Sequence, residues 1–461
     1  MSAGTLPEGW AEVPVSSVAS LIRGVTYKKE QAINYRKDDY LPLIRANNIQ
    51  NGKFDTTDLV FVPKNLVKES QQISPEDIVI AMSSGSKSVV GKSAHQHLPF
   101  ECSFGAFCGV LRPEKLIFPS FIAHFTKSSF YRNKISSLSA GANINNIKPA
   151  SFDLIKIPIP SLAEQKIIAE KLDTLLAQVD TAKARLEQIP QILKRFRQAV
   201  LAMAISGKLT EEWRRNSNTD LSKWVNSNIG ELAQVATGKT PKRTEITYWE
   251  NGSIPWLTSS STGRAYVDTA EQFITLVALK ECTLKIFPPG TLLLAMYGEG
   301  KTRGQVTELK ISATCNQACA AIICNKEKID LQFLKMRLME NYEETRKAAA
   351  GGNQPNLNLN KVREIPVLVP PQTEQKEIVR RVEQLFAYAD TVEKQVHSAL
   401  TRVNNLTQSI LAKAFRGELT AQWRVENPDL ISGENSAAAL LEKIKVERAA
   451  SGSKKVSRKK K

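Results

Sequence analysis

The stretch AMYGEGKT (295–302) is the part of the sequence most like a catalytic motif, because it resembles a nucleotide-binding P-loop after the apolar run TLLL. However, Ala295 stands where the strict pattern has glycine, and the residues after it, with Gly304 among them, disfavour the helix that must hold the phosphate. The sequence also has no GxSxG motif, no HExxH motif and no DPPY-type motif of amino-group methyltransferases. We therefore predict no ATP site and no catalytic residues in this chain.

Cysteine and histidine spacing gives no sign of a metal site. The six cysteines include no CxxC pair, and the four histidines do not lie at zinc-ligand spacing from them. Buried, reduced thiols are the expected state. No apolar run approaches the ~20 residues that span a bilayer, and the N-terminus does not resemble a signal peptide. We expect a cytoplasmic protein without a bound metal or cofactor.

Recognition of a polyanion is the chemistry that the composition favours. The chain has 63 Lys and Arg against 46 Asp and Glu, a net charge of +17, and the tail SKKVSRKKK (453–461) supplies six of these charges. The remainder, 17 − 6 = 11, is spread along the rest of the chain. Such an excess suits nucleic acid first and an anionic membrane surface second.

Loops rich in basic and amide residues recur in two parts of the chain, at 24–30, 43–48, 83–93 and 142–146 and again at 237–243, 257–264, 297–305 and 351–356. Lys and Arg neutralise phosphate, while Asn, Gln and Arg pair with base edges. The candidate DNA-binding residues in the first set are Tyr27, Lys28, Lys29, Arg45, Asn47, Asn48, Ser86, Lys87, Lys92, Asn143 and Asn145. Those in the second set are Lys239, Lys242, Arg243, Arg264, Tyr297, Lys301, Arg303, Gln305, Asn353, Gln354 and Asn356.

Two stretches, 163–214 and 373–424, repeat each other without a gap at an offset of 210 residues, with 17 identities in 52 positions. Both open with EQK and close with one phrase, GKLTEEWR (207–214) and GELTAQWR (417–424). Between these, apolar residues alternate at steps of four and three, which predicts a coiled-coil helix roughly 50 Å long. The simplest partner for each helix is the other. Two unrelated amphipathic helices are the alternative.

Three residues in these helices carry further expectations. Pro190 lacks a backbone donor and is expected to kink or interrupt the first helix. Trp213 and Trp423 follow the glycine stop of each helix. They are expected either to pin the exit segment back onto the helix pair or to contact another subunit.

The blocks ahead of the helices are faintly related to each other. Trp10 matches Trp224 and Gly24 matches Gly238, both at an offset of 214, and PEDIVIAM (75–82) matches PGTLLLAM (289–296). Short apolar runs broken by Gly, Ser and Asn clusters predict an α+β domain that occurs twice. We therefore expect a globular block at 1–155, a helix at 156–220, a second block at 221–365, a second helix at 366–424, and a C-terminal helix with a basic tail at 425–461.

Taken together, the opening LPEGW, the two EQ-led helices ending in GxLTxxWR, and GGNQPNLN before the second helix resemble the specificity subunit, HsdS, of type I restriction-modification systems. The resemblance covers the whole chain and is closest to the EcoKI-like, type IA branch. It implies two α+β target recognition domains separated by two conserved spacer helices. It also implies that these helices form an antiparallel coiled coil with pseudo-two-fold symmetry.

The resemblance further implies a non-catalytic subunit that binds double-stranded DNA together with two methylation subunits and two restriction subunits. Those partners use S-adenosylmethionine, ATP and magnesium. The first block, from LIRGVTYKKEQ through SAGANINNIKPASFDL, implies AAC as the first half-site. A six-base gap and a GTRC-like second element are expected to complete the target.

A basic coiled-coil scaffold that associates with RNA or a membrane is the alternative function. It accounts for the charge and the helices. It does not account for two divergent blocks on one duplicated scaffold.

Overall fold

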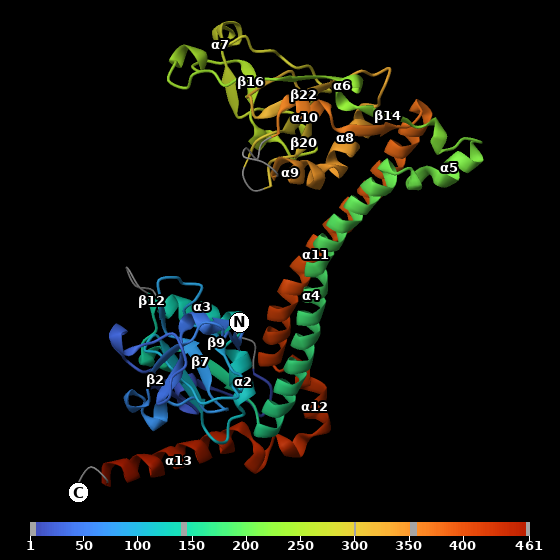
Figure 1. Cartoon of the computed structure of the whole chain (residues 1–461). Coiled ribbons are helices and arrows are strands. Elements are labelled where there is room, and N and C mark those ends of the chain that lie inside the picture. The colour runs from blue at the N-terminus through green and yellow to red at the C-terminus, as the bar shows by residue number, and fades with distance from the viewer. Residues whose placement is uncertain (1–5, 140–144, 299–300, 351–356, 458–461) are drawn as a thin grey trace. The chain divides into compact units, whose positions relative to one another are not determined.

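The computed structural model describes residues 6–139, 145–298, 301–350 and 357–457. It divides into two compact units, of which unit 1 comprises 1–187 and 398–461 and unit 2 comprises 188–397 (Figure 1). Each unit holds one globular α+β block and parts of the two long helices. Among the described residues, no helix is long and apolar enough to cross a membrane.

The block in unit 1 is built on one four-stranded sheet, with strands in the order β2-β11-β7-β9, and one three-stranded sheet in the order β10-β3-β6. The first sheet is antiparallel, and β3 pairs in parallel with β10 in the second. These strands are β2 (Ala19–Arg23), β3 (Tyr40–Ile44), β6 (Val60–Pro63), β7 (Ile78–Ala81), β9 (Ser93–Ala94), β10 (Ser103–Phe104) and β11 (Cys108–Pro113).

Shorter elements complete this block. They are the strands β1 (Ala11–Pro14), β4 (Ile49–Gln50), β5 (Lys53–Phe54), β8 (Ser83–Ser84), β12 (Asn145–Asn146) and β13 (Lys156–Ile159), and the helices α1 (Val15–Val18), α2 (Pro119–Phe125) and α3 (Ser129–Leu138). β1 pairs with β13, so the two ends of the block meet before the chain enters the first long helix.

The block in unit 2 repeats these two sheets, with one additional strand in the larger sheet. Its larger sheet has the order β15-β22-β19-β20-β17, and its smaller sheet has the order β18-β16-β21. The strands are β14 (Val225–Asn228), β15 (Ala233–Thr237), β16 (Ile254–Leu257), β17 (Tyr266–Val267), β18 (Gln272–Ile274), β19 (Leu292–Ala295), β20 (Val306–Leu309), β21 (Thr314–Cys315), β22 (Cys319–Cys324) and β23 (Pro366–Val369). The helices are α6 (Ile229–Leu232), α7 (Leu276–Glu281), α8 (Leu331–Glu340), α9 (Tyr342–Ala350) and α10 (Leu359–Arg363).

The matched glycines lie where a strand end of the larger sheet closely approaches a strand end of the smaller sheet in each block. An added Cβ would lie 2.1 Å from the Gly105 carbonyl oxygen at Gly24 and 1.5 Å from the Cys315 carbonyl oxygen at Gly238. No side chain fits at such a backbone approach. The glycines match in the sequence because both blocks need the same close backbone contact between their two sheets.

The long helices are α4 (Leu162–Ile205) and α11 (Gln372–Phe415), each of 44 residues. Both are continuous, and α4 passes through Pro190 without a break. Of the two expected effects, the interruption is wrong, because this proline is exposed and a carbonyl that loses its helical partner at the surface can bond to water. The kink at Pro190 stays a prediction.

The two helices pack antiparallel within each unit. In unit 1, Ile168 and Leu172 of α4 share a buried cluster with Ile410 and Phe415 of α11. In unit 2, Val200, Leu201 and Ala204 of α4 share a cluster with Ile378 and Val382 of α11. The prediction that the helices pair with each other is thus confirmed. The apolar residues that repeat at steps of four and three form one seam along each helix, and Ala182 and Leu406 belong to it. Both are exposed, so the seam is buried mainly toward the helix ends.

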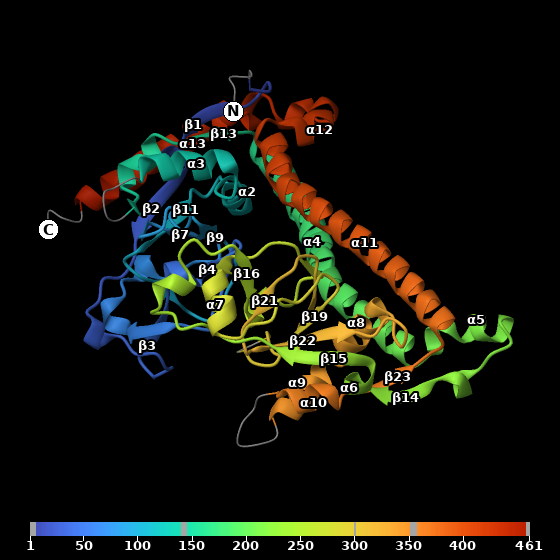
Figure 2. The same ribbon diagram turned by 90° about the horizontal axis from the view of Figure 1, so that it is seen from above.

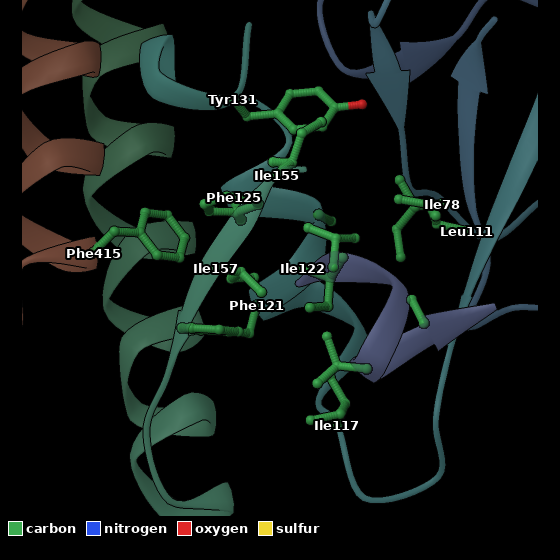
Figure 3. Packing of buried hydrophobic residues seen from close by; sticks show 14 of the residues in the cluster. Ile78, Leu111, Ile117, Phe121, Ile122, Phe125, Tyr131, Ile155, Ile157 and Phe415 are labelled. Atoms are coloured by element: carbon green, nitrogen blue, oxygen red, sulfur yellow. The ribbon is translucent and has the colours of Figure 1, made fainter. Parts of the chain in front are cut away.

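Aromatic side chains anchor the helix pair to the block in unit 1. Figure 3 shows Phe415 of α11 pointing toward Phe121 and Phe125 of α2. Its ring centroid lies 5.2 Å from that of Phe121 and 5.3 Å from that of Phe125, at tilted and edge-on angles. Such pairs add to the apolar burial that holds the block against the helices.

A buried carboxylate closes each helix pair, and we call its set of partners the glutamate clamp. In unit 1 Glu164, which is fully buried, accepts hydrogen bonds from Trp10 Nε1 at 2.8 Å and from Thr420 Oγ1 and Arg424 at 2.6 Å each. Arg424 also donates to the Gly417 carbonyl at 2.8 Å. The glutamate in the EQ of one repeat is thus bound by the GxLTxxWR phrase of the other repeat, which we call the exit phrase.

The same clamp recurs in unit 2. The buried Glu374 accepts from Trp224 Nε1 at 2.8 Å, from Thr210 Oγ1 at 2.7 Å and from Arg214. The glycine that opens each exit phrase, Gly207 or Gly417, has a φ of 76°. This left-handed conformation is typical of a glycine that ends a helix.

Trp213 and Trp423 lie in the short helices α5 (Glu211–Asn216) and α12 (Ala421–Glu426), and both are half-buried. The threonine and arginine of each phrase bind the clamp carboxylate, and a basic side chain of the opposite helix donates to the phrase as well: Arg381 to the Leu209 carbonyl at 2.9 Å and Lys171 to the Leu419 carbonyl at 3.0 Å. Which of the two expected roles Trp213 and Trp423 have stays a prediction. The indole N–H groups in the clamp belong to Trp10 and Trp224, near the start of each block.

A C-terminal helix, α13 (Ala437–Ser457), lies along the block of unit 1 (Figure 2). Ala437, Leu440 and Ile444 are buried there. Arg448 donates to Glu114 at 2.8 Å and to the Ser16 carbonyl at 2.7 Å. Residues 458–461 of the basic tail lie outside the described part of the chain.

Neutralising the clamp glutamate tests how much its ion pair and hydrogen bonds contribute to the free energy of unfolding. We expect Glu374→Gln to destabilise the chain by about 3 kcal/mol, because Arg214 is left buried without its counter-charge. The matched control is Glu393→Gln on the same helix, whose side chain is 53% exposed and pairs with Arg197 at 2.8 Å. That exposed pair is expected to contribute less than about 1 kcal/mol. Urea unfolding of both variants measures the difference, and equal losses would contradict the clamp.

Candidate nucleic-acid interface

Strand register brings the candidate loops of unit 1 to one edge of the block. Arg23 at the end of β2 is opposite Gly109, and Ala81 at the end of β7 is opposite Cys108. In the smaller sheet, Ile44 at the end of β3 is paired with Phe104. The chain therefore leaves three strands at the same edge, which we call the reading edge of unit 1. It carries the loops after residues 23, 44 and 82 and the turn at 105–107.

A cavity of about 960 Å³ lies at this edge. The predicted residues Tyr27, Lys29, Arg45 and Asn47 line it, together with Phe107. An added Cβ at Gly105 would lie 3.9 Å from both Arg45 Cγ and Tyr27 Cε1, so the two side chains flank that turn. Four of the predicted residues are thus close together, whereas Lys28 is exposed beside them.

Arg45 and Asn47 share an acidic neighbour. Arg45 donates to the Asp58 carboxylate at 2.8 Å, and Asn47 Nδ2 approaches the same carboxylate at 3.3 Å. The Asp58 side chain is 70% exposed. An incoming phosphate or base edge can therefore compete for these donors, since a surface ion pair of this kind is weak.

Asn48 has a structural role instead of the predicted contact. It is 2% exposed, and its amide accepts from Arg45 N and donates to the Asp55 and Asp58 carbonyls, all at 2.9 Å. It caps the short turn Ala46–Asn48 that follows β3. Its side chain is fully occupied by the backbone, so it has no group left for DNA.

The loop after β7 presents Ser86 and Lys87, both of which are exposed. The strand pair β12–β8 places Asn145 opposite Ser84, beside this loop. Asn145 is 6% exposed, and its Nδ2 lies 3.4 Å from the Gly85 carbonyl. Asn145 therefore stabilises the loop through this buried contact with its backbone. Asn143 lies outside the described residues.

A second polar cleft, of about 820 Å³, lies between the block of unit 1 and its helices. Lys92 lines it, together with Lys53, Lys127 and Arg132, which the sequence did not single out. Burial lowers the pKa of Lys127. Lys92 is thus separated from the cavity at the reading edge.

The backbone hydrogen bonds of unit 2 define an equivalent reading edge. Met82 N donates to the Phe107 carbonyl, and Met296 N donates to the Ala318 carbonyl, both at 2.8 Å. Leu257 at the end of β16 is paired with Cys315 as Ile44 is with Phe104. The predicted recurrence of the loops at matching places is confirmed for the loops after β15, β16 and β19.

Arg243 is held in a fixed position near this edge of unit 2. Its guanidinium lies 4.0 Å from the Trp249 ring centroid and 4.8 Å from that of Trp256. One of its nitrogens donates to Gln272 Oε1 at 2.7 Å. Ring stacking and one hydrogen bond leave its remaining donors for an anion.

The other candidates of unit 2 differ in exposure. Lys239, Lys242, Arg264 and Lys301 are exposed, and Lys239 donates to Thr283 Oγ1 at 2.6 Å. Tyr297, Arg303 and Gln305 are half-buried around the turn before β20. Asn353, Gln354 and Asn356 lie outside the described residues.

The segment that resembles a P-loop has a different structure. Ala295 ends β19, and the chain enters β20 at Val306 in place of a helix. Part of the segment, 299–300, is not described. The helix N-terminus that a nucleotide phosphate needs is therefore missing after this strand.

The expected burial of the thiols holds for four cysteines, whereas Cys282 and Cys324 are half-buried. All six cysteines are free, and four of them are buried. Burial raises the pKa of Cys102 and of Cys108 to about 12. Across the described residues, no group of three or more His, Cys, Asp or Glu side chains is arranged to hold a metal ion.

Sequence reasoning identified Tyr27 but missed two other aromatic side chains of the reading edge in unit 1. Phe107 is 69% exposed and Tyr35 is 60% exposed, and both line the cavity. A lone phenylalanine between Ala106 and Cys108 looks like a core residue in the sequence, so no pattern singles it out.

The comparisons with known proteins agree with this duplicated scaffold. A family model described as type I restriction modification DNA specificity domain matches residues 7–191 and again 221–402. The chain is 63% identical, over the full length of both proteins, to the type I restriction enzyme StySPI specificity subunit of Salmonella potsdam. It is likewise 63% identical over both full lengths to the EcoKI specificity subunit of Escherichia coli (strain K12).

Solved structures share the fold at low sequence identity. The HsdS subunit from Thermoanaerobacter tengcongensis is 19% identical, with a TM-score of 0.60 over 90% of this chain and 99% of that chain. A chain from a structural study of complex assembly in the type I R-M system is 18% identical, with a TM-score of 0.68 over 90% of this chain and all of that one.

The neighbouring asparagines at 47 and 48 are predicted to respond differently to substitution. Asn48→Ala is expected to lower the free energy of unfolding by about 1–3 kcal/mol, because it leaves buried backbone groups unpaired. Asn47→Ala, at an exposed position, is expected to change it by less than about 0.5 kcal/mol and to weaken DNA binding. Denaturant unfolding and fluorescence anisotropy with labelled duplex measure the two effects. A stable Asn48→Ala protein would contradict the assignment.

Proposed function

The chain belongs to the family of type I restriction-modification DNA specificity proteins, and from this premise we propose that its two reading edges bind the two halves of one split DNA target. It is a specificity subunit, so it recognises DNA sequence and is not itself catalytic. Such subunits work in a complex with other subunits and DNA.

One observation carries the proposal of two readers. The same loops leave the same strands at one edge of each block, yet the side chains there differ. At the end of the paired strand of the smaller sheet, unit 1 has Arg45 and unit 2 has Thr258. Since hydrogen-bonding side chains discriminate bases, different side chains on equal scaffolds suit two different half-sites.

Membership of the family supports a proposal for the partners and cofactors. We propose that two methylation subunits and two restriction subunits assemble with this chain, in keeping with a glutamate clamp that occurs once in each unit. Adenine methylation and restriction would use S-adenosylmethionine, ATP and magnesium bound by those subunits. The complex would act in the cytoplasm, where the host DNA lies.

The proposed target is AAC, six unspecified bases and a GTRC-like second element. Its support is the resemblance of the first block to the EcoKI-like branch, together with the 63% identity to the EcoKI specificity subunit. Half-site centres near one helical turn, about 10 bp, suit two reading modules. The alternative of a basic scaffold for RNA or membrane leaves the family match unexplained.

The decisive experiment is to express the chain with its companion methylation subunits and to map methylated adenines in host DNA. We expect a split motif of AAC, a gap of about six bases and a second fixed element. The chain expressed without those subunits is the control and should give no methylation. A continuous motif, or no methylation by an assembled complex, would contradict two half-site readers.

Exchange of the second block tests whether the two edges act independently. Replacing 221–365 with the corresponding block of another family member is expected to change the second half-site and to leave the first unchanged. The reason is that the reading edge of unit 1 is built from residues of unit 1. The same methylation map measures both half-sites, so the first serves as an internal control. A changed first half-site would refute independence.

A further inference from the structure

Phe107 is an apolar side chain held out into solvent by a fixed backbone. Its carbonyl accepts from Met82 N at 2.8 Å and from Ser83 N at 3.2 Å. Phe107 lies in a turn that is closed by Cys108 N donating to Gly105 O at 2.8 Å, and Gly105 N donates to Ile44 O at 3.0 Å. The side chain is nevertheless 69% exposed. A large apolar group fixed in this way loses favourable burial unless a ligand covers it.

Unit 2 presents an aromatic at the same place but from the neighbouring strand. Ala318 occupies the position of Phe107, as its carbonyl accepts from Met296 N at 2.8 Å and from Tyr297 N at 3.4 Å. Tyr297 occupies the position of Ser83. At this pair of hydrogen-bonded positions each unit thus has one aromatic side chain, which comes from the turn before β11 in unit 1 and from the loop after β19 in unit 2. Two unrelated surface aromatics would not be expected at one pair of hydrogen-bonded positions.

The surroundings of Phe107 indicate what covers it. Arg45, Asn47 and Lys29 line the same cavity, and these side-chain types bond to base edges and phosphates. An apolar side chain among such donors needs an apolar group on the DNA. In the major groove of unmodified DNA, the C5-methyl group of thymine is the apolar group that the base edges present.

We propose that Phe107 packs against the C5-methyl group of a thymine in the half-site bound by unit 1, and so helps to determine specificity there. This inference rests on the proposed function, since it names a contact within that DNA complex. Tyr297 has the corresponding place on the reading edge of unit 2. Neither residue takes part in chemistry; each selects a base by an apolar contact.

Replacing thymine with uracil removes that methyl group and leaves the base pairing intact. Each thymine of the first half-site is replaced in turn, on either strand, and affinity is measured for the chain in complex with its methylation subunits. The unaltered protein is expected to lose about fourfold in affinity at one position, the effect of one methyl group returned to water. Phe107→Ala is expected to bind the thymine and uracil duplexes equally, whereas Phe107→Leu keeps part of the preference.

A swap variant and a matched control complete the test. Ser83→Tyr combined with Phe107→Ala rebuilds in unit 1 the arrangement of unit 2 and is expected to restore the thymine preference. Leu154→Ala removes a side chain that is 60% exposed in the turn before β13, and the preference is expected to remain.

The outcomes separate this proposal from the proposed function. If the complex binds a split target but uracil has no effect at any thymine, the methyl contact is overturned and the function stands. A uracil effect that persists in Phe107→Ala also overturns it, because another residue then makes the contact. Failure of the complex to prefer any split target contradicts the proposed function itself.

Discussion

A negative charge buried at the start of each long helix is the constraint on which the rest of the structure depends. An unpaired carboxylate in the interior is very costly, so Glu164 and Glu374 require donors with good geometry. In each unit these three donors come from two separate segments: a tryptophan at the start of the block, and a threonine and an arginine that follow the opposite helix. Satisfying one carboxylate therefore fixes the antiparallel helix pair and the entry into the block together.

This constraint explains why the chain contains one phrase twice. The sequence predicted paired helices of equal register with glycine stops, because periodicity and repeats are visible without a structure. It did not predict that the EQ of one repeat binds the GxLTxxWR of the other. That contact joins residues 256 and 260 positions apart in unit 1, and no local pattern reports such a distance. The sequence also did not predict that Ala182 and Leu406 are exposed, because the spacing of apolar residues along a helix does not show which of them another segment covers.

The candidate interface was predictable as a set of loops but not residue by residue. Basic and amide side chains after short apolar strands indicated where the loops would be, and strand register brings those of each unit to one edge. Whether a given side chain faces the ligand depends on its local hydrogen bonds. Asn48 and Asn47 are alike in the sequence, yet the backbone of one turn occupies the amide of Asn48 and leaves that of Asn47 exposed. Phe107 went unnoticed because exposure is not encoded in residue type.

The separation between scaffold and reading edge gives a physical reason why the blocks can diverge. Tyr27 packs on a small cluster around Val25, Leu43 and Val62, apart from the core that α4 and α11 complete. Arg243 rests on Trp249 and Trp256, whose cluster is also separate from the helices. Substitutions in these two small clusters therefore change the side chains at the reading edge with little effect on the stability of the glutamate clamp. Tyr297 is different, since it packs on the cluster that includes Val200 and Val382 of the long helices. A residue exchanged into that position must therefore fit the helix core as well as the DNA contact proposed for it, which restricts the side chains that it can accept.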